Sequence, residues 1–211
     1  MKNPYTKYFG LSLLVLGLYQ LTKTLVHVNM EYGIQGQIIL MGNWLKLHYT
    51  LNPGMAFGLE LGGDNGKLML TTFRIIAMGG IGYYLVYLIK NKMPVGYITC
   101  IALILGGAVG NLFDSVFYGV LLGNAPDGSP TPWLHGQVVD MIYFDIWEGF
   151  MPDWIPFFGG QYYAFWPIFN VADATIFCSI TTLLIFNHKW TQPELKSGEK
   201  TEPVSAESTE S

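Results

Sequence analysis

Four long stretches of mostly apolar residues dominate the chain of 211 residues. They cover residues 8–28, 68–89, 95–120 and 165–187. An α-helix needs about 20 predominantly apolar residues to cross the hydrocarbon core of a membrane. The pattern therefore predicts four transmembrane helices, and the expected fold class is an all-α membrane protein.

Lysines at the ends of these stretches predict their orientation, because positive side chains are enriched on the cytoplasmic side of membrane proteins. Four spans put one group of lysines on a common side: Lys2, Lys7, Lys90, Lys92 and Lys189. We therefore expect both termini and the 90–94 turn in the cytoplasm. Segments 29–67 and 121–164 then face outward, although Lys46 and Lys67 in the first of them are a weaker opposing signal.

The segments outside the spans have patterns of their own. Apolar and polar residues alternate in "IQGQIIL" and "WLKLHYTL" within residues 33–51, which predicts strands of a small outer β-cradle. Segment 121–164 is rich in Gly, Pro and aromatic residues, and its tryptophans suit an interfacial aromatic belt. Residues 191–211 have almost nothing to bury, so we expect a disordered cytoplasmic tail after a single membrane domain at 1–190.

Composition excludes several classes of protein. Only 12% of the residues are charged, against about 25% in soluble domains. No basic stripe runs along the chain, so we expect no nucleic-acid partner. Cys100 and Cys178 fall inside apolar runs, and we interpret them as small apolar side chains rather than as a disulfide or metal ligands.

Polar and ionisable side chains inside a membrane span are rare and are usually functional or paired. This chain has them in every span, and two more acids follow in the second outer segment. They are Lys23, His27, Arg74, Asn111, Asp114, Asn170 and Asp173 in the spans, and Asp140 and Asp145 outside.

Each of these groups also has a structural interpretation. The glycines of "GGAVGN" let another backbone come close, so Asn111 and Asp114 fit a hydrogen-bonded helix contact. Asn170 and Asp173 fit a helix N-cap and an acid that complements the helix dipole. Asp140 fits an acid in a wet interfacial loop.

The predicted topology gives these polar residues a common place. The outer ends of the third and fourth spans and the Asp140 segment lie at one membrane depth, around one polar cavity. Two carboxylates that share a cavity cannot both ionise readily, so the pair holds one proton. One aspartate can then take a proton from water while the other polarises a carbonyl, as in aspartic proteases. No Ser-His-Asp order, H-E-x-x-H motif or Cys-His pair supports another hydrolytic design.

Four sequence blocks resemble the lipoprotein signal peptidase (signal peptidase II) family. They are "NPGMAFG" at 52–58, "GGAVGNLFD" at 106–114, "VVDMI" at 138–142 and "FNVAD" at 169–173. Their order and the four spans also agree with the family. The resemblance covers residues 8–188.

The resemblance implies roles for individual residues and a fold. The catalytic dyad would be Asp140 and Asp173. The residues lining the substrate pocket would be Asn52, Gly54, Gly107, Asn111 and Asn170, supported by Lys23, Asp114 and Ala172. The fold would be four transmembrane helices with a small outer β-cradle from the first outer segment and an outer loop or mobile helix in the second.

The resemblance also implies an activity. The family cleaves diacylglyceryl-modified prolipoproteins within the bilayer, just before the lipidated cysteine. The partners would be prolipoprotein substrates and membrane lipids, with no metal or organic cofactor. The protein would be a monomer of the bacterial inner membrane with its active site near the outer face.

Three features depart from the family pattern. Tyr19 stands in "YQLTK" where the family has the Asp of D-Q-x-x-K, although Lys23 is kept. Ser115 stands where the family has Arg. The stretch between Asp114 and Asp140 is longer than usual, which indicates an added outer loop near the active site. None of the three touches the two aspartates.

Two other classes compete with a peptidase. A transporter or channel also carries Asp and Asn in the membrane, but an ion path needs polar groups at several depths. Here these groups gather at one end, apart from Arg74, Lys23 and His27. A membrane scaffold that binds partners through its outer aromatic surface would tolerate the loss of both aspartates.

Overall fold

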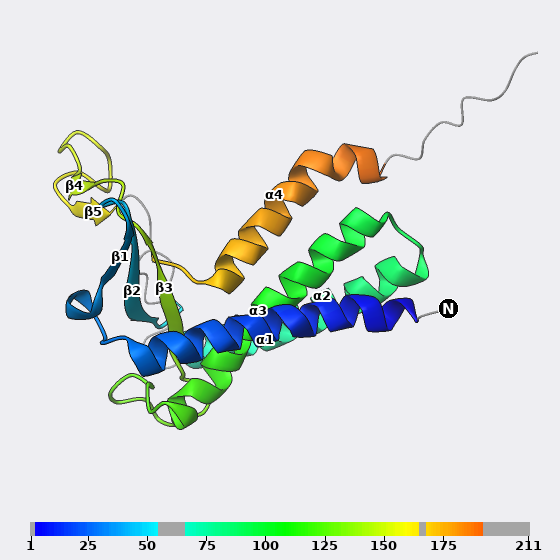
Figure 1. Ribbon diagram of the computed structural model, residues 1–211, viewed down its shortest axis with the longest axis horizontal. Coiled ribbons are helices and arrows are strands. Elements are labelled where there is room, and N and C mark those ends of the chain that lie inside the picture. The colour runs from blue at the N-terminus through cyan, green and yellow to red at the C-terminus, as the bar shows by residue number, and fades with distance from the viewer. Residues whose placement is uncertain (1–2, 55–65, 165–167, 192–211) are drawn as a thin grey trace, which may run out of the picture.

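The computed structural model describes residues 3–54, 66–164 and 168–191 (Figure 1). Four long helices make up most of it: α1 (Pro4–Asn29), α2 (Gly66–Lys90), α3 (Val95–Leu121) and α4 (Val171–Thr191). All four are long and apolar enough to cross a membrane. The four predicted spans are therefore confirmed, while the predicted disordered tail lies outside the described residues.

The fourth helix begins later than the hydrophobic pattern predicted, at Val171 instead of residue 165. Asn170 sets this start, because its side-chain oxygen accepts hydrogen bonds from the backbone N–H groups of Ala172 and Asp173 at 2.9 and 3.1 Å. Aromatic residues before Asn170 counted as apolar in the pattern, so hydrophobicity alone extended the span too far. Residues 165–167 lie outside the described residues.

Three antiparallel strands form one sheet, in the order β1 (Ile38–Met41), β2 (Leu45–Asn52) and β3 (Val138–Phe144). The strands predicted in the first outer segment are confirmed. Strand β3, from the segment 121–164, joins them in the same sheet. The pairing of β3 with β2 sets Asp140 opposite Thr50, close to the end of β2.

A hairpin of two strands, β4 (Glu148–Phe150) and β5 (Tyr162–Ala164), follows β3. Residues 122–164 are all described, and they form loops and strands but no helix. Of the outer loop or helix expected in this segment, the structure therefore has the loop. The turn of the hairpin exposes large aromatic side chains, among them Trp154 and Phe157.

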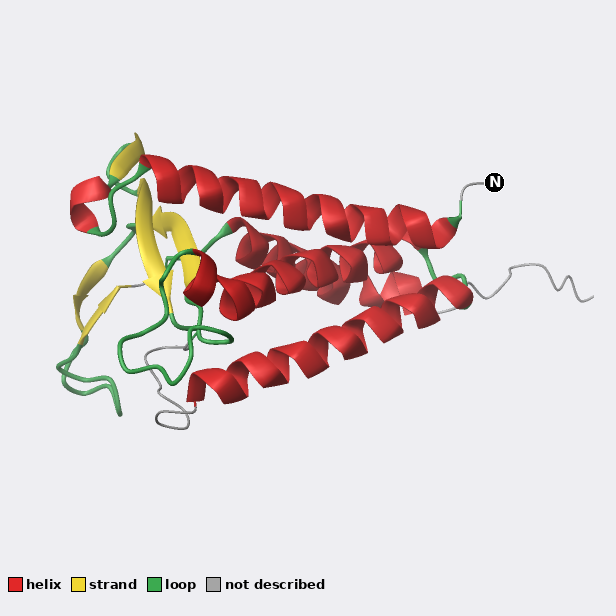
Figure 2. Ribbon diagram, turned by 90° about the horizontal axis from the view of Figure 1, so that it is seen from below, coloured by secondary structure: helices red, strands yellow, loops and turns green. Residues whose placement is uncertain are grey.

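Both sheets lie at one end of the helices. In Figures 1 and 2 the strands gather where α1 and α3 end and α4 begins, whereas the N-terminus and the α2–α3 turn lie at the opposite end. Helix α3 contacts each of the other three helices. This arrangement brings the start of α4, the end of β2 and the middle of β3 into one region.

Glycines on α3 let its neighbours come close. A Cβ atom at Gly106 would lie 2.7 Å from the carbonyl oxygen of Ser12 on α1, and one at Gly107 would lie 3.0 Å from that of Ala172 on α4. The close helix contact predicted for this stretch is therefore present. It holds the first turn of α4 against α3, at the level where the polar residues gather.

Candidate active site

Asp140 lies on β3 and is buried, with an exposed fraction of 1%. Two amides donate hydrogen bonds to its carboxylate: Nδ2 of Asn52 to Oδ2 at 2.9 Å, and Nδ2 of Asn170 to Oδ1 at 2.6 Å. Asn52 is itself oriented, because its Oδ1 accepts the backbone N–H of Gly54 at 2.7 Å. Both oxygens of Asp140 therefore have a fixed amide partner.

Asn170 joins the two aspartates of the predicted dyad. Its side-chain oxygen caps α4, which leaves its Nδ2 to donate to Asp140. Its backbone N–H donates to Oδ2 of Asp173 at 3.2 Å, in the first turn of the helix. This reciprocal pattern is that of a capping box. The capping interpretation of Asn170 is confirmed, and Asp173 takes part in the cap.

Asn111 of α3 completes the site. Its Nδ2 donates to Oδ1 of Asp173 at 2.8 Å, and its Oδ1 lies 3.3 Å from Nδ2 of Asn170. Residues from β2, β3, α3 and α4 therefore meet in one network. We name this network the aspartate cluster, and its members are Asn52, Asn111, Asp140, Asn170 and Asp173.

The surroundings of Asp140 change its acidity. Burial raises the pKa of Asp140 from 3.8 to about 6, because a buried carboxylate loses the hydration that favours its charged form. Hydrogen bonds from Asn170 and Asn52 act in the opposite direction, and the negative charge of Asp173 raises the pKa again. A carboxyl group that titrates near neutral pH can accept or give a proton during a reaction.

Asp114 belongs to a neighbouring buried cluster around Lys23 of α1. The two side chains form an ion pair, and both are fully buried. Nε2 of Gln20 donates to Oδ1 of Asp114 at 3.1 Å, and the hydroxyl of Tyr19 lies 3.0 Å from its Oδ2. Tyr19 also contacts Oδ1 of Asn111. The residue that departs from the family pattern thus connects this ion pair with the aspartate cluster.

Ser115, the second departure, is next to an arginine from another helix. Nη1 of Arg74 on α2 donates to Oγ of Ser115 at 2.9 Å. The same guanidinium packs on Gly54, where a Cβ atom would come within 2.9 Å of Nη2. Gly54 has a φ of +87°, which glycine adopts readily. Arg74 therefore occupies the space beside Gly54 that a side chain would fill.

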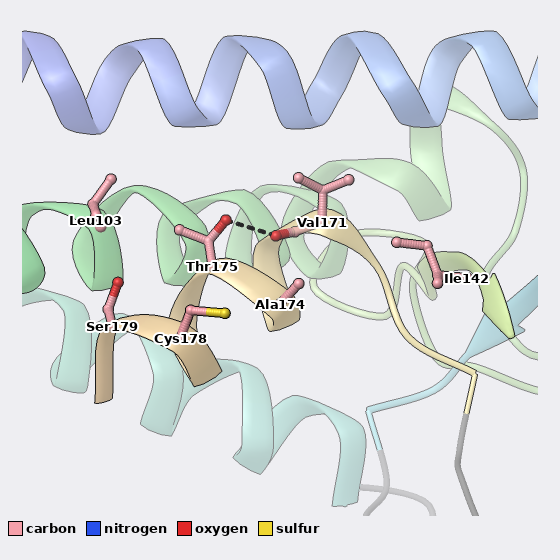
Figure 3. Close-up of a pocket in the computed structure, with 7 residues that line it drawn as sticks. All are labelled: Leu103, Ile142, Val171, Ala174, Thr175, Cys178 and Ser179. Atoms are coloured by element: carbon pink, nitrogen blue, oxygen red, sulfur yellow. Dashed lines mark hydrogen bonds between the residues drawn. The ribbon is translucent and has the colours of Figure 1, made fainter. Parts of the chain in front are cut away.

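An apolar pocket opens between α3 and α4 beside the aspartate cluster, with a volume of about 360 Å³. Figure 3 shows its lining: Leu103, Ile142, Val171, Ala174, Thr175, Cys178 and Ser179. The Thr175 hydroxyl donates to the carbonyl oxygen of Val171 at 2.7 Å, within α4. Val171 and Ala174 directly follow Asn170 and Asp173 in the chain, so the pocket adjoins the carboxylates.

The histidine, cysteine and acidic side chains of this region do not form a metal-binding group. Among the residues that the structure describes, no three of these side chains come close enough together to hold a metal ion. Cys100 is buried, Cys178 is exposed, and both thiols are free.

The predicted site residues have different surroundings in the structure. The three asparagines contact the two aspartates directly, whereas Gly107 and Ala172 form the α3–α4 contact. Lys23 and Asp114 pair with each other, and Gly54 contacts Arg74. All the residues singled out by the motifs therefore lie in the aspartate cluster or in contact with its supports.

Sequence reasoning missed some residues of this region. Gln20 binds Asp114, and the Tyr118 hydroxyl donates to Oε1 of Gln20 at 2.5 Å. Gln20 is the Gln of the D-Q-x-x-K pattern, but that pattern does not indicate its contacts. Tyr118 carries no signal, because its contact depends on how α1 packs on α3. Arg74 had a signal, being an ionisable residue in an apolar span, but nothing in the sequence indicated which residues it contacts.

Two solved structures of bacterial membrane enzymes, obtained by the in meso method, share this fold. The first has a TM-score of 0.58 at 24% identity, covering 92% of this chain and 94% of that one. The second has a TM-score of 0.56 at 25% identity, covering 91% and 94%. The helices and the sheet therefore have the fold of these multi-pass membrane enzymes.

The sequence model described as "Signal peptidase (SPase) II" matches residues 11–188. The chain belongs to the signal peptidase II family, whose members are peptidases. A lipoprotein signal peptidase of Amoebophilus asiaticus is 43% identical over 208 residues, covering 98% of this chain and 88% of that protein. One of Porphyromonas gingivalis is 39% identical over 205 residues, covering 92% and 88%.

Proposed function

We propose that the protein is an aspartic endopeptidase that removes signal peptides from diacylglyceryl-modified prolipoproteins. It cleaves within the bilayer, just before the lipidated cysteine. Relatives named lipoprotein signal peptidase support the substrate class. One observation carries the catalytic part of the proposal: two carboxylates, from β3 and α4, are joined through Asn170.

The pair holds one proton at neutral pH. Burial already raises the pKa of Asp140 to about 6, and the negative charge of Asp173 opposes a second ionisation. The two groups titrate as a coupled pair, so the proton belongs to both. One carboxyl group is then available as an acid and the other as a base.

The reaction follows from this charge state. The ionised aspartate takes a proton from water, and the water oxygen forms a bond with the scissile carbonyl carbon. The protonated aspartate gives its proton to the carbonyl oxygen. When the tetrahedral intermediate collapses, one of its hydroxyl protons passes to the aspartate that is now ionised, and the carbonyl re-forms. The C–N bond breaks, and the cysteine nitrogen leaves with the proton that the other aspartate took from water.

The asparagines have two tasks in this scheme. In the free protein, amides of Asn52, Asn111 and Asn170 fix the directions of the two carboxylates. When substrate enters, they also hydrogen-bond its backbone around the scissile bond. Such bonds are stronger in a site of low dielectric constant than in water. Orientation of the acids and of the substrate thus depends on the same side chains.

The pocket between α3 and α4 supports entry of the substrate from the bilayer. Its lining is largely apolar, and two of its residues, Val171 and Ala174, are the chain neighbours of Asn170 and Asp173. Ligand sites with this character bury the apolar parts of a ligand and orient it with few polar groups. The apolar part of a prolipoprotein reaches the aspartate cluster by this route.

We also propose a bacterial inner-membrane monomer with both termini in the cytoplasm and the aspartate cluster near the outer face. Lys90 and Lys92, in the turn at the end of the helices opposite the sheets, support this orientation. The reaction needs no metal or organic cofactor. We therefore expect cleavage to continue at the wild-type rate after treatment with a chelator.

Replacement of each aspartate tests the proposal. We expect Asp140→Asn and Asp173→Asn each to abolish cleavage of a diacylglyceryl-modified precursor peptide, because an amide can neither hold nor release the shared proton. The released signal segment is measured on a gel. The thermal unfolding of each variant in detergent is compared with that of the wild type.

Asp145→Asn is the matched control, because Asp145 follows β3 and pairs with Lys46 at 2.5 Å, outside the aspartate cluster. This variant is expected to cleave at close to the wild-type rate. Processing by either dyad variant at a near wild-type rate would refute the assignment. A protein that serves as a scaffold would keep its partners after both aspartates were replaced.

A further inference from the structure

Arg74 is a cation within an apolar helix, and the reaction scheme above gives it no role. A charged side chain inside a membrane span is unfavourable and usually marks a functional site. Its guanidinium donates to Oγ of Ser115, which is fully buried. Ion pairs in the described ranges join Lys23 to Asp114 and Lys46 to Asp145, and none includes Arg74.

The guanidinium contacts two residues that are connected to the aspartates through hydrogen bonds, one toward Asp140 and one toward Asp173. On one side it packs on Gly54, whose N–H is bound by Asn52, the amide partner of Asp140. On the other side it binds Ser115.

Oγ of Ser115 in turn donates to the carbonyl oxygen of Asn111 at 3.1 Å. Asn111 is the amide partner of Asp173. Arg74, which lies on α2, therefore contacts neighbours of both Asn52 and Asn111 and so connects the two sides of the aspartate cluster.

The charged groups around Asp140 and Asp173 indicate that Arg74 acts on the two carboxylates through its positive charge. The charged and titratable groups that face the two aspartates are Tyr19 and Lys23 of α1, Arg74 of α2, Asp114 and Tyr118 of α3, and each aspartate itself. Lys23 forms an ion pair with Asp114, and its charge also lowers the pKa of Asp140. Arg74 lies within electrostatic range of both Asp140 and Asp173. Among the described residues it is thus a second cation that acts on the pair, and none of the ion pairs found there includes it.

We propose that Arg74 is a positioning residue for catalysis: oriented by Ser115 and Gly54, its fixed positive charge keeps the aspartate pair singly ionised at neutral pH. The proposal rests on the dyad proposed above. It also accounts for Ser115, because a small hydroxyl residue on α3 leaves room for a guanidinium that comes from α2. An arginine at position 115 would fill that same space.

Arg74→Gln is the direct test, read as cleavage rate against pH with the diacylglyceryl-modified peptide. A nearby cation favours an ionised carboxylate, so its removal makes the first deprotonation of the pair harder. The acid limb of the profile is the part at low pH where the rate rises with pH. We expect this limb to move to higher pH by about one unit. Cleavage at pH 6 then falls more than cleavage at pH 8, a difference that a purely structural role does not produce.

Three companion variants sharpen the test. Arg74→Lys keeps the charge, so its acid limb stays close to that of the wild type. Lys67→Gln removes another buried cation of α2, whose Nζ donates to the carbonyl oxygen of Pro53 at 2.7 Å, and its limb is expected not to move. The exchange variant Arg74→Ser with Ser115→Arg returns a guanidinium to the same place and restores the wild-type limb, whereas Arg74→Ser alone does not.

An unmoved acid limb in a folded Arg74→Gln variant overturns the proposal, as does an equal shift in Lys67→Gln. If Arg74→Gln loses its thermal unfolding transition in detergent, the exchange variant decides, and a displaced limb in that variant counts against Arg74. The dyad is judged separately. A normal profile for Arg74→Gln beside an inactive Asp140→Asn removes only the role of Arg74, whereas an active Asp140→Asn removes the dyad.

Discussion

Each amide of the aspartate cluster has its two ends assigned to different partners. The oxygen of Asn52 binds the N–H of Gly54 while its nitrogen binds Asp140, and Asn170 divides its oxygen and nitrogen between the α4 cap and Asp140. A side-chain amide cannot rotate freely once both ends are bound. The asparagines therefore present donors, and not acceptors, to the carboxylates.

The burial of Asp140 predicts a pH dependence of stability. The pKa of Asp140 is about 6, against 3.8 in an unfolded chain, so the folded protein binds the proton more tightly. Between these two values the folded state holds more protons than the unfolded state, and stability falls as the pH rises. We expect thermal unfolding in detergent to show this slope for the wild type, and a flatter curve for Asp140→Asn.

Asn52→Ala separates the two influences on Asp140. The variant loses a hydrogen bond to the ionised carboxylate, so the pKa of Asp140 rises further above about 6. The acid limb of the cleavage profile is expected to move up by about one pH unit, because a hydrogen bond to a charged group contributes about 1.5 kcal/mol. A limb that moves down would show that the amide does not donate to the carboxylate in the working enzyme.

At the scale of elements, the first turn of α4 has both a structural and a chemical task. Asn170 begins the helix through its oxygen and orients Asp140 through its nitrogen. Serine is also a good N-cap residue, but it has no amide nitrogen. The two tasks can therefore be separated by the choice of substitution.

We expect Asn170→Ser to unfold close to the wild-type temperature but to cleave poorly. Asn170→Ala is expected to lose both activity and about 1 kcal/mol of stability, the typical contribution of an N-cap. Thermal unfolding in detergent and the gel assay measure the two effects. Equal stability of the two variants would mean that the cap contributes little to holding α4 in place.

The contact between α1 and α3 depends on the absence of a side chain at Gly110. A Cβ atom there would lie 2.4 Å from the ring of Tyr19, whereas one at Gly79 of α2 would meet nothing within 4 Å. We expect Gly110→Ala to lose about 1–3 kcal/mol through overpacking. Gly79→Ala, the matched control, is expected to be neutral or slightly stabilising in the same unfolding measurement.

The elements also show what the sequence could and could not reveal. Hydrophobic length predicted all four helices, and alternation predicted β1 and β2. The start of α4 was misplaced because its signal is a cap at Asn170, which an average over apolar residues does not detect. Strand β3 was missed because Asp140 interrupts its pattern, and the role of Tyr19 depends on contacts with residues more than ninety positions away.

At the scale of the whole molecule, the sheets and the α2–α3 turn lie at opposite ends of the helices (Figure 1). The proposed orientation puts the turn in the cytoplasm and the sheets outside. Asn91 in the turn and Asp127 in the second outer segment are both exposed, so single cysteines at these positions report on the two sides.

We expect Asp127→Cys to react with a membrane-impermeant thiol reagent in intact cells, and Asn91→Cys to react only after permeabilisation. The background for both is Cys100→Ala with Cys178→Ala, which removes the two native thiols. Mass-tagged protein is counted on a gel. The reverse pattern of labelling would invert the orientation and put the aspartate cluster near the cytoplasm.

The order of elements along the chain has a consequence for biogenesis. A ribosome delivers Asp140 on β3 before it has made α4, which carries Asp173 and Asn170. The nascent chain therefore holds only one acid of the dyad until its last helix inserts. If the proposed dyad is the catalytic pair, fragments that lack α4, whether unfinished or left by degradation, are expected to leave passing precursors uncleaved. Activity would then begin only when synthesis of the last helix is complete.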